Sequence, residues 1–218
     1  MRKMNNFETF RGMIEKYLDN NDVKINVISD LHEISLNKSG KQDGNYVYDG
    51  QYNLEVIDMD NLAKYGYRVV KQLEDINNVV NTADGFLINK QNEWFFIEFK
   101  DSEIKASNDK VKNSVLKKAY SNWYMLLDIL YTMKDQEEMY QGFEVNNPIQ
   151  FSKDNIYYIL VCSSEKNPNV YKQIKNHEHL NENYTPEFMR RLKDYLFKDA
   201  YIYTEYQLEQ KFAKVFEY

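Results

Sequence analysis

Residues that break or cross-link a backbone are scarce in this chain of 218 residues, which has 7 Gly, 3 Pro and a single Cys. One Cys cannot form an internal disulfide, which fits a reducing compartment. No stretch is dominated by Gly, Pro or Ser, and no repeat occurs at the periods of solenoid proteins. The sequence therefore predicts a single domain over residues 1–218, without an internal linker.

Long apolar runs are lacking as well. The longest, from Trp123 to Tyr131, is interrupted by Asp128 and is too short to cross a bilayer. Residues 1–18 carry charged side chains throughout, unlike the continuous apolar region of a signal peptide. We therefore expect a protein of the cytoplasm that does not enter a membrane.

Positive charge is in deficit over the whole chain, whose formal net charge is −6. This argues against a protein that grips nucleic acid with its whole surface, because such affinity comes mainly from Lys and Arg. Between Lys100 and Lys118, however, lysines outnumber acidic residues. Lys110 and Lys112 in this segment are the predicted contacts for a nucleic-acid backbone, although a solvated helix face explains the same lysines equally well.

Regular elements are predicted from apolar spacing. Steps of three and four predict helices, and alternation or short apolar runs predict strands. The predicted helices are 5–18, 60–80, 111–130, 185–197 and 205–216, and the predicted strands are 23–28, 53–59, 86–88, 94–99, 156–162 and 200–203. The continuous apolar run 156–162 is typical of a central strand covered on both faces. Such interleaving predicts an α/β (α+β) fold with a mixed sheet.

Two of these strands should form a hairpin, because only the polar residues 89–93 separate them. If the turn is centred on Gln91, Asp84 lies seven residues before the centre and Glu98 seven residues after it, so the two face each other. Directly opposed carboxylates on neighbouring strands are destabilising. We therefore expect a positive charge between Asp84 and Glu98.

Glu98 and Lys100 are two positions apart on the second strand, so they point to the same face. A charged pair at the end of an apolar run is costly unless it is paired or bound to an ion. One or two carboxylates are what Mg²⁺ usually requires from a protein, and a nearby amine can orient water or neutralise developing charge. The pattern fits a metal site for phosphoryl chemistry.

The segments Thr82-Ala83-Asp84-Gly85 and Ile97-Glu98-Phe99-Lys100 resemble the motif of the PD-(D/E)XK nuclease superfamily. The resemblance covers about residues 60–162, and Ala83 stands where the motif has proline. It implies a restriction-endonuclease-like core, in which a mixed sheet with a β-hairpin is flanked by helices. It also implies Mg²⁺ or Mn²⁺ held by Asp84 and Glu98, with Lys100 as the catalytic amine. The family often adds a Glu from the first core helix, for which Glu74 is the candidate and Glu15 a competitor.

Three hypotheses remain open from the sequence. The first is a Mg²⁺-dependent nuclease acting on DNA or RNA, which requires Asp84, Glu98 and Lys100 to converge. The second is a non-catalytic interaction or regulatory protein, with a protein partner, on a degenerate nuclease scaffold; the acidic net charge favours it. The third is an accidental motif in another α/β domain. Side chains that point apart, or an aromatic ring between them, would count against catalysis.

Other reactive side chains have simpler explanations. Cys162 lies at the end of an apolar run, where a small buried residue is expected. His177 and His179 lie in a polar segment, predicted to be a loop, without a third metal ligand nearby in the sequence. Trp94 and Trp123 have strand and helical spacing, which is more typical of core residues than of base-stacking ones.

Overall fold

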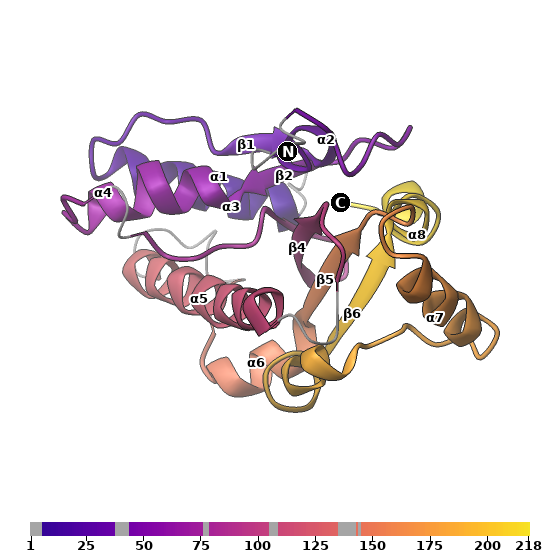
Figure 1. Cartoon of the computed structure of the whole chain (residues 1–218). Coiled ribbons are helices and arrows are strands. Elements are labelled where there is room, and N and C mark those ends of the chain that lie inside the picture. Colours follow the sequence, from indigo (N-terminus) through magenta and orange to yellow (C-terminus); the bar gives the residue numbers. More distant parts are fainter. Residues whose placement is uncertain (1–5, 38–43, 76–78, 105–108, 135–142, 144) are drawn as a thin grey trace.

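The fold is α/β and is built on one open, mixed sheet of six strands in the order β1-β2-β3-β4-β5-β6. Figure 1 shows the computed structural model, in which helices lie on both sides of the sheet. The structure describes residues 6–37, 44–75, 79–104, 109–134, 143 and 145–218.

The strands follow the chain in the same order as they follow the sheet. They are β1 (Ile28–Asp30), β2 (Glu55–Asp58), β3 (Gly85–Ile88), β4 (Trp94–Lys100), β5 (Ile156–Cys162) and β6 (Asp199–Thr204). Within the described residues the α-helices are α1 (Asn6–Asp19), α2 (Leu31–Ile34), α3 (Met59–Asn61), α4 (Arg68–Val70), α5 (Asp109–Met133), α6 (Pro148–Asn155), α7 (Pro168–Glu178) and α8 (Glu205–Gln207). Short π and 3₁₀ segments are η2 (Leu62–Tyr67), η4 (Glu187–Met189), η5 (Leu192–Leu196), η6 (Leu208–Phe212) and η7 (Ala213–Val215).

The type of strand pairing changes once across the sheet. The pairs β1/β2, β2/β3 and β3/β4 are antiparallel, whereas β5 is parallel to both β4 and β6. The parallel pair β4 and β5 needs a long connection, which α5 and α6 provide. The prediction of a central strand at 156–162 is confirmed, because β5 spans these residues and six of its seven are buried.

The alternation of side chains along β4 separates two hydrophobic layers. Trp94 contacts Phe10 of α1 and Trp123 of α5, with ring centroids 5.0 and 6.3 Å apart. The next residue, Phe95, points to the other face and contacts Phe212 of η6 at 5.0 Å. The helices α1 and α5 therefore cover one face of the sheet, and the C-terminal segment covers part of the other (Figure 1). Glu98, four residues after Trp94, belongs to the face under α5.

The hairpin has the predicted register. Strands β3 and β4 pair Ile88 with Trp94 and Gly85 with Ile97, so the turn is centred on Gln91. Asn92 turns the chain with a φ of 61°, a conformation that Asn tolerates better than most residues. The paired register ends at Gly85, and Asp84 directly precedes it.

The predicted helix at 60–80 is wrong for residues 71–75, 79 and 80, and its residues 76–78 lie outside the described part of the chain. Its N-cap is Asp58 rather than Asp60, it passes through the π segment η2, and it ends at Val70. The wider π turn moves the buried face by about one residue. Gly66 is therefore buried instead of Tyr65, and a Cβ at Gly66 would lie 2.9 Å from Leu18 of α1.

Other elements also differ from the predicted ones. The predicted helix at 185–197 is divided into η4 and η5, and the predicted strand at 23–28 is replaced by the shorter β1. Helices α6 and α7 were not predicted; each begins with a Pro at its first turn, and neither has a long apolar stripe. His177 consequently lies in α7 rather than in a loop.

Candidate active site

The acidic pair lies at one end of the hairpin. Glu98 is in β4, and its side chain is 0% exposed. Asp84 immediately precedes β3, and its side chain is 19% exposed. Both carboxylates lie beneath α5, and a single ammonium group lies close to both of them.

That ammonium belongs to Lys118 of α5. Its Nζ atom lies 3.0 and 2.8 Å from the two Glu98 carboxylate oxygens and donates to both. The same Nζ is 3.9 Å from Asp84 Oδ1. The expected positive charge between the two acids is therefore present, but it comes from α5, whereas the sequence predicted only Lys100 as an amine beside the acids.

Lys100 lies on the outer side of the same pair. Its Nζ is 2.7 Å from Glu98 Oε1, and its side chain is 23% exposed. Glu98 and Lys100 thus share a face of β4, as the sequence predicted. Because Lys100 is more exposed than Lys118 at 17%, it is the cation better placed to meet a group arriving from solvent.

Asp84 is held from two sides. Its Oδ2 atom accepts a hydrogen bond of 2.6 Å from the backbone N–H of Phe99. Burial and then the charge of Glu98 raise the pKa of Asp84 well above its ordinary value, against the opposing effects of Lys118 and the Phe99 N–H. Burial lowers the pKa of Lys118, but Glu98 and Asp84 outweigh it and raise that pKa overall. The two carboxylates therefore lie against two ammonium groups, those of Lys118 and Lys100.

Three further polar residues surround this group. Asp60 of α3 adds to the raised pKa of both Asp84 and Lys118, and it accepts a 2.6 Å hydrogen bond from Thr82. The hydroxyl of Tyr158 is fully buried and has no hydrogen-bond partner among the described residues. Burial and then the charges of Glu98 and Asp84 raise its pKa.

The segment before Asp84 is tied to α5 by Asn122. The Asn122 Oδ1 atom accepts from the backbone N–H of Ala83 at 3.2 Å, and the Asn122 side chain is fully buried. Lys118 and Asn122 are four positions apart, about one helical turn, so α5 presents both to the same end of the hairpin.

The additional acid predicted from the family resemblance is not brought to this site. Glu74 is exposed beyond the end of α4, where its carbonyl accepts from Arg68. Glu15 of α1 pairs with Arg11 at 2.8 Å and is also largely exposed. Asp60 is the acid that the structure places beside the pair instead.

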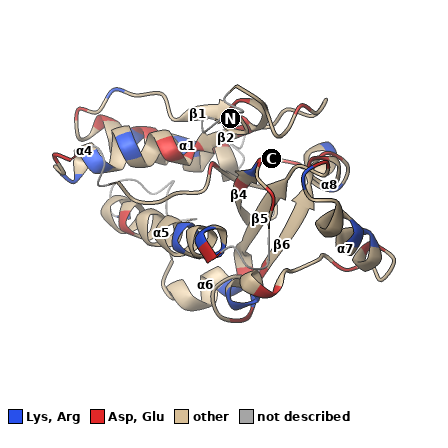
Figure 2. Cartoon of the chain, viewed as in Figure 1, with Lys and Arg blue, Asp and Glu red and all other residues tan. Residues whose placement is uncertain are grey.

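The two lysines predicted to bind nucleic acid lie in the first turn of α5. Lys110 is exposed, and Lys112 lies 3.4 Å from Asp109. Basic residues gather at this end of α5 (Figure 2). Lys112 also lines a hollow of about 650 Å³ together with Arg191, Asp109 and Glu187. The hollow is therefore of mixed charge.

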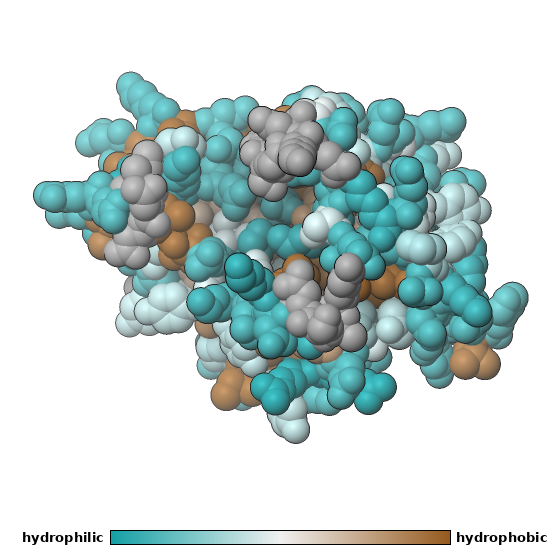
Figure 3. All heavy atoms as spheres, in the orientation of Figure 1, coloured by the Kyte–Doolittle hydropathy of each residue, from teal (hydrophilic) through white to brown (hydrophobic). Residues whose placement is uncertain are grey.

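The aromatic residues divide clearly between core and surface. Trp94 and Trp123 are core residues, as predicted. Tyr120 and Tyr124, in contrast, are exposed on α5. The face seen in Figure 3 is mainly hydrophilic, with separate apolar spots.

The spacing of α5 contains the signal that would have identified Lys118. Residues at steps of three and four from Val115 include Lys118 and Asn122 before the apolar Leu126, so two polar residues interrupt the buried stripe. A polar residue in the middle of a core stripe needs a buried partner. Glu98 is that partner for Lys118.

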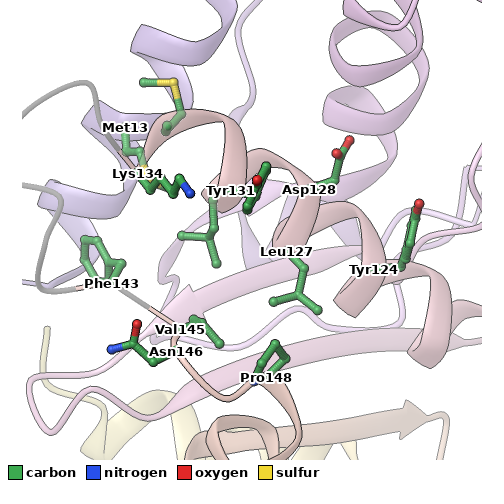
Figure 4. A pocket seen from close by; sticks show the side chains of 12 residues that line it. Met13, Tyr124, Leu127, Asp128, Tyr131, Lys134, Phe143, Val145, Asn146 and Pro148 are labelled. Carbon is green, nitrogen blue, oxygen red and sulfur yellow. The ribbon is translucent and has the colours of Figure 1, made fainter.

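A hollow of about 670 Å³ lies elsewhere, between α1, the second half of α5 and the residues Phe143, Val145, Asn146 and Pro148 (Figure 4). Its acidic group is Asp128, which accepts from Tyr67 at 2.7 Å and pairs with Lys71. These two partners occupy the Asp128 carboxylate.

The thiol of Cys162 is buried. Burial and then the charge of Glu205 raise its pKa to about 12.

Comparison with known proteins supplies no relative: no family model, no curated protein and no solved structure matches the chain. Among the helices of the described residues, none combines the length and the apolar character needed to cross a membrane. The same part of the chain contains no group of three or more His, Cys, Asp or Glu side chains arranged to hold a metal ion.

Proposed function

We propose that this chain is a nuclease that hydrolyses phosphodiester bonds in DNA or RNA with the help of Mg²⁺ or Mn²⁺. The observation that carries the proposal is that Asp84, just before β3, and Glu98 of β4 converge on one cation, with Lys100 beside them. The order of hairpin, α5 and parallel β5 is also that of the core implied by the resemblance to PD-(D/E)XK nucleases.

The donor set fits a small, hard divalent ion. Such an ion is commonly held by one or two carboxylates, with water and substrate oxygens as its other ligands. Asp84 and Glu98 supply the carboxylates, and the buried Tyr158 hydroxyl needs a hydrogen-bond partner close to them. A bound Mg²⁺ would make a water molecule more acidic and stabilise charge on the phosphate.

The residues of the chain divide the remaining work. Asp84 and Glu98 would bind the ion through their carboxylate oxygens. The backbone N–H of Phe99 fixes the orientation of the Asp84 side chain. Lys100, the more exposed amine, neutralises negative charge on a phosphate or orients the attacking water. Lys110 lies nearer the start of α5, where it can contact a nucleic-acid backbone.

Calorimetric titration with Mn²⁺ tests the metal site. We expect binding by the wild-type chain and none by the Asp84→Asn/Glu98→Gln variant, which preserves the shape of both side chains. A labelled oligonucleotide then tests cleavage. Lys100→Ala should retain the metal and lose about 10² to 10⁴ in rate, the usual contribution of one acid–base group. Absence of metal binding by the wild type at millimolar Mn²⁺ would refute the proposal.

One observation favours the second hypothesis, a non-catalytic interaction or regulatory protein on a degenerate nuclease scaffold. The ammonium groups of Lys118 and Lys100 already lie beside the two carboxylates, so the fold does not need a metal to balance their charge. In that case neither Mn²⁺ binding nor cleavage is expected. The titration above distinguishes the two functions.

A further inference from the structure

The position between Asp84 and Glu98 already contains a positive charge. The Lys118 Nζ atom lies 2.8 Å from one Glu98 oxygen and 3.9 Å from Asp84 Oδ1. A Mg²⁺ ion binds oxygen at about 2.0 to 2.1 Å and accepts only oxygen-rich, nearly octahedral surroundings. An ammonium and such an ion cannot share the same two carboxylates at these distances without strong repulsion.

We propose that Lys118 is an internal competitor for the divalent ion, so that metal binds between Asp84 and Glu98 only when the Lys118 ammonium moves out. The inference rests on the proposed function, because it concerns the same metal site. It adds a residue that lowers metal affinity and makes the metal-free site electrically balanced. The exchange breaks no covalent bond, and Lys118 keeps its proton.

The surroundings of Lys118 allow this exchange. Its side chain is 17% exposed and has a flexible stem of four carbons, so the ammonium can change partner. Asp60 is the alternative partner, since its charge already acts on Lys118. Lys100 is a different case, because its more exposed ammonium approaches Glu98 Oε1 from the outer side of the pair.

The test compares Mn²⁺ affinities by calorimetry for the wild type, Lys118→Gln, Lys118→Met and Lys117→Gln. Lys117 is the matched control, because it is the exposed neighbour on the same helix and its substitution removes the same charge. We expect both Lys118 variants to bind Mn²⁺ on the order of tenfold more tightly than the wild type, or more. Lys117→Gln should change the affinity less than about threefold, because an exposed charge is screened by solvent.

Thermal unfolding with and without Mn²⁺ supplies a second readout. Because a ligand stabilises the folded state that binds it, Mn²⁺ should raise the Tm of Lys118→Gln more than that of the wild type. If Lys118→Met does not fold, Lys118→Gln still carries the test, since its amide can donate one hydrogen bond to Glu98.

The outcomes separate the two proposals. Equal or weaker Mn²⁺ binding by the Lys118 variants, with binding by the wild type intact, overturns the competition and leaves the metal site standing. A gain of the same size in Lys117→Gln also overturns it, because the effect would then be one of net charge. If no variant binds Mn²⁺, both the competition and the proposed nuclease are overturned.

Discussion

Glu98→Gln should destabilise the fold strongly. Glu98 is completely buried, and its two oxygens lie 3.0 and 2.8 Å from the Lys118 ammonium. At an effective dielectric constant of about 20, a charge pair at 2.8 Å is worth about 6 kcal/mol of Coulomb energy. In the variant Lys118 keeps Asp84 at 3.9 Å, which at the same dielectric constant is worth about 4 kcal/mol.

The net cost is smaller than the lost attraction, because removing Glu98 also relieves its repulsion with Asp84. Removing one partner of a buried ion pair typically costs about 3 to 5 kcal/mol. With a urea m-value of about 3 kcal/mol per molar for a chain of this size, the midpoint of unfolding should fall by more than about 1 M.

Urea unfolding, followed by circular dichroism in metal-free buffer, measures this loss. Glu93→Gln is the matched control on the same hairpin. Glu93 pairs with Lys198 at 2.7 Å but is 26% exposed, so its loss should cost less than about 1 kcal/mol.

A double variant tests the pairing itself. Glu98→Gln/Lys118→Gln should be more stable than the sum of the single effects predicts, by about 1 to 3 kcal/mol. If Glu98→Gln costs no more than Glu93→Gln, or if the two substitutions are additive, the buried pair does not stabilise the fold and the electrostatic reasoning fails.

Three further predictions concern residues around the site. Asp84 has a raised pKa in the folded state, so its contribution to stability is complete below about pH 4 and is lost as the pH rises through the folded pKa. The free energy of unfolding of Asp84→Asn should therefore exceed that of the wild type by about 1 kcal/mol or more at pH 8 and by much less at pH 5. A difference that does not change with pH would contradict this prediction. Asn122→Ala removes the buried acceptor of the Ala83 N–H, so the free energy of unfolding should fall by about 1 to 3 kcal/mol in urea titrations. An unchanged midpoint would show that this hydrogen bond does not stabilise the fold. Lys110→Glu should weaken oligonucleotide binding at low salt and reduce the slope of log affinity against log salt concentration by about one. An unchanged slope would show that Lys110 does not contact the nucleic-acid backbone.

The sequence by itself determined the hairpin and the residues at its end. Alternation along a strand has a period of two, and the polar turn is short, so the register about Gln91 depends only on residues close in sequence. Three predictions followed from that register: that Asp84 lies close to Glu98, that Glu98 and Lys100 share a face, and that the two acids need a positive charge between them. The long α5 and the central β5 were also predicted from strong local patterns.

The middle of the first core helix was beyond such local reasoning. The π segment η2 changes which residues face the core, and Gly66 packs closely against Leu18 of α1. Whether a helix admits an extra residue in one turn depends on the helix packed against it. The end of this helix at Val70 left Glu74 outside the site.

Only the tertiary structure decided which cation balances the two acids. Lys118 is separated from Glu98 by 20 residues and was one of several lysines in the same segment. The packing of α5 across β3 and β4 selects it, because its position in the buried stripe points its ammonium at the acids while Lys117 remains exposed. Local spacing shows that a polar residue interrupts an apolar stripe, but the identity of its partner depends on how a helix and a sheet from distant parts of the chain are packed together.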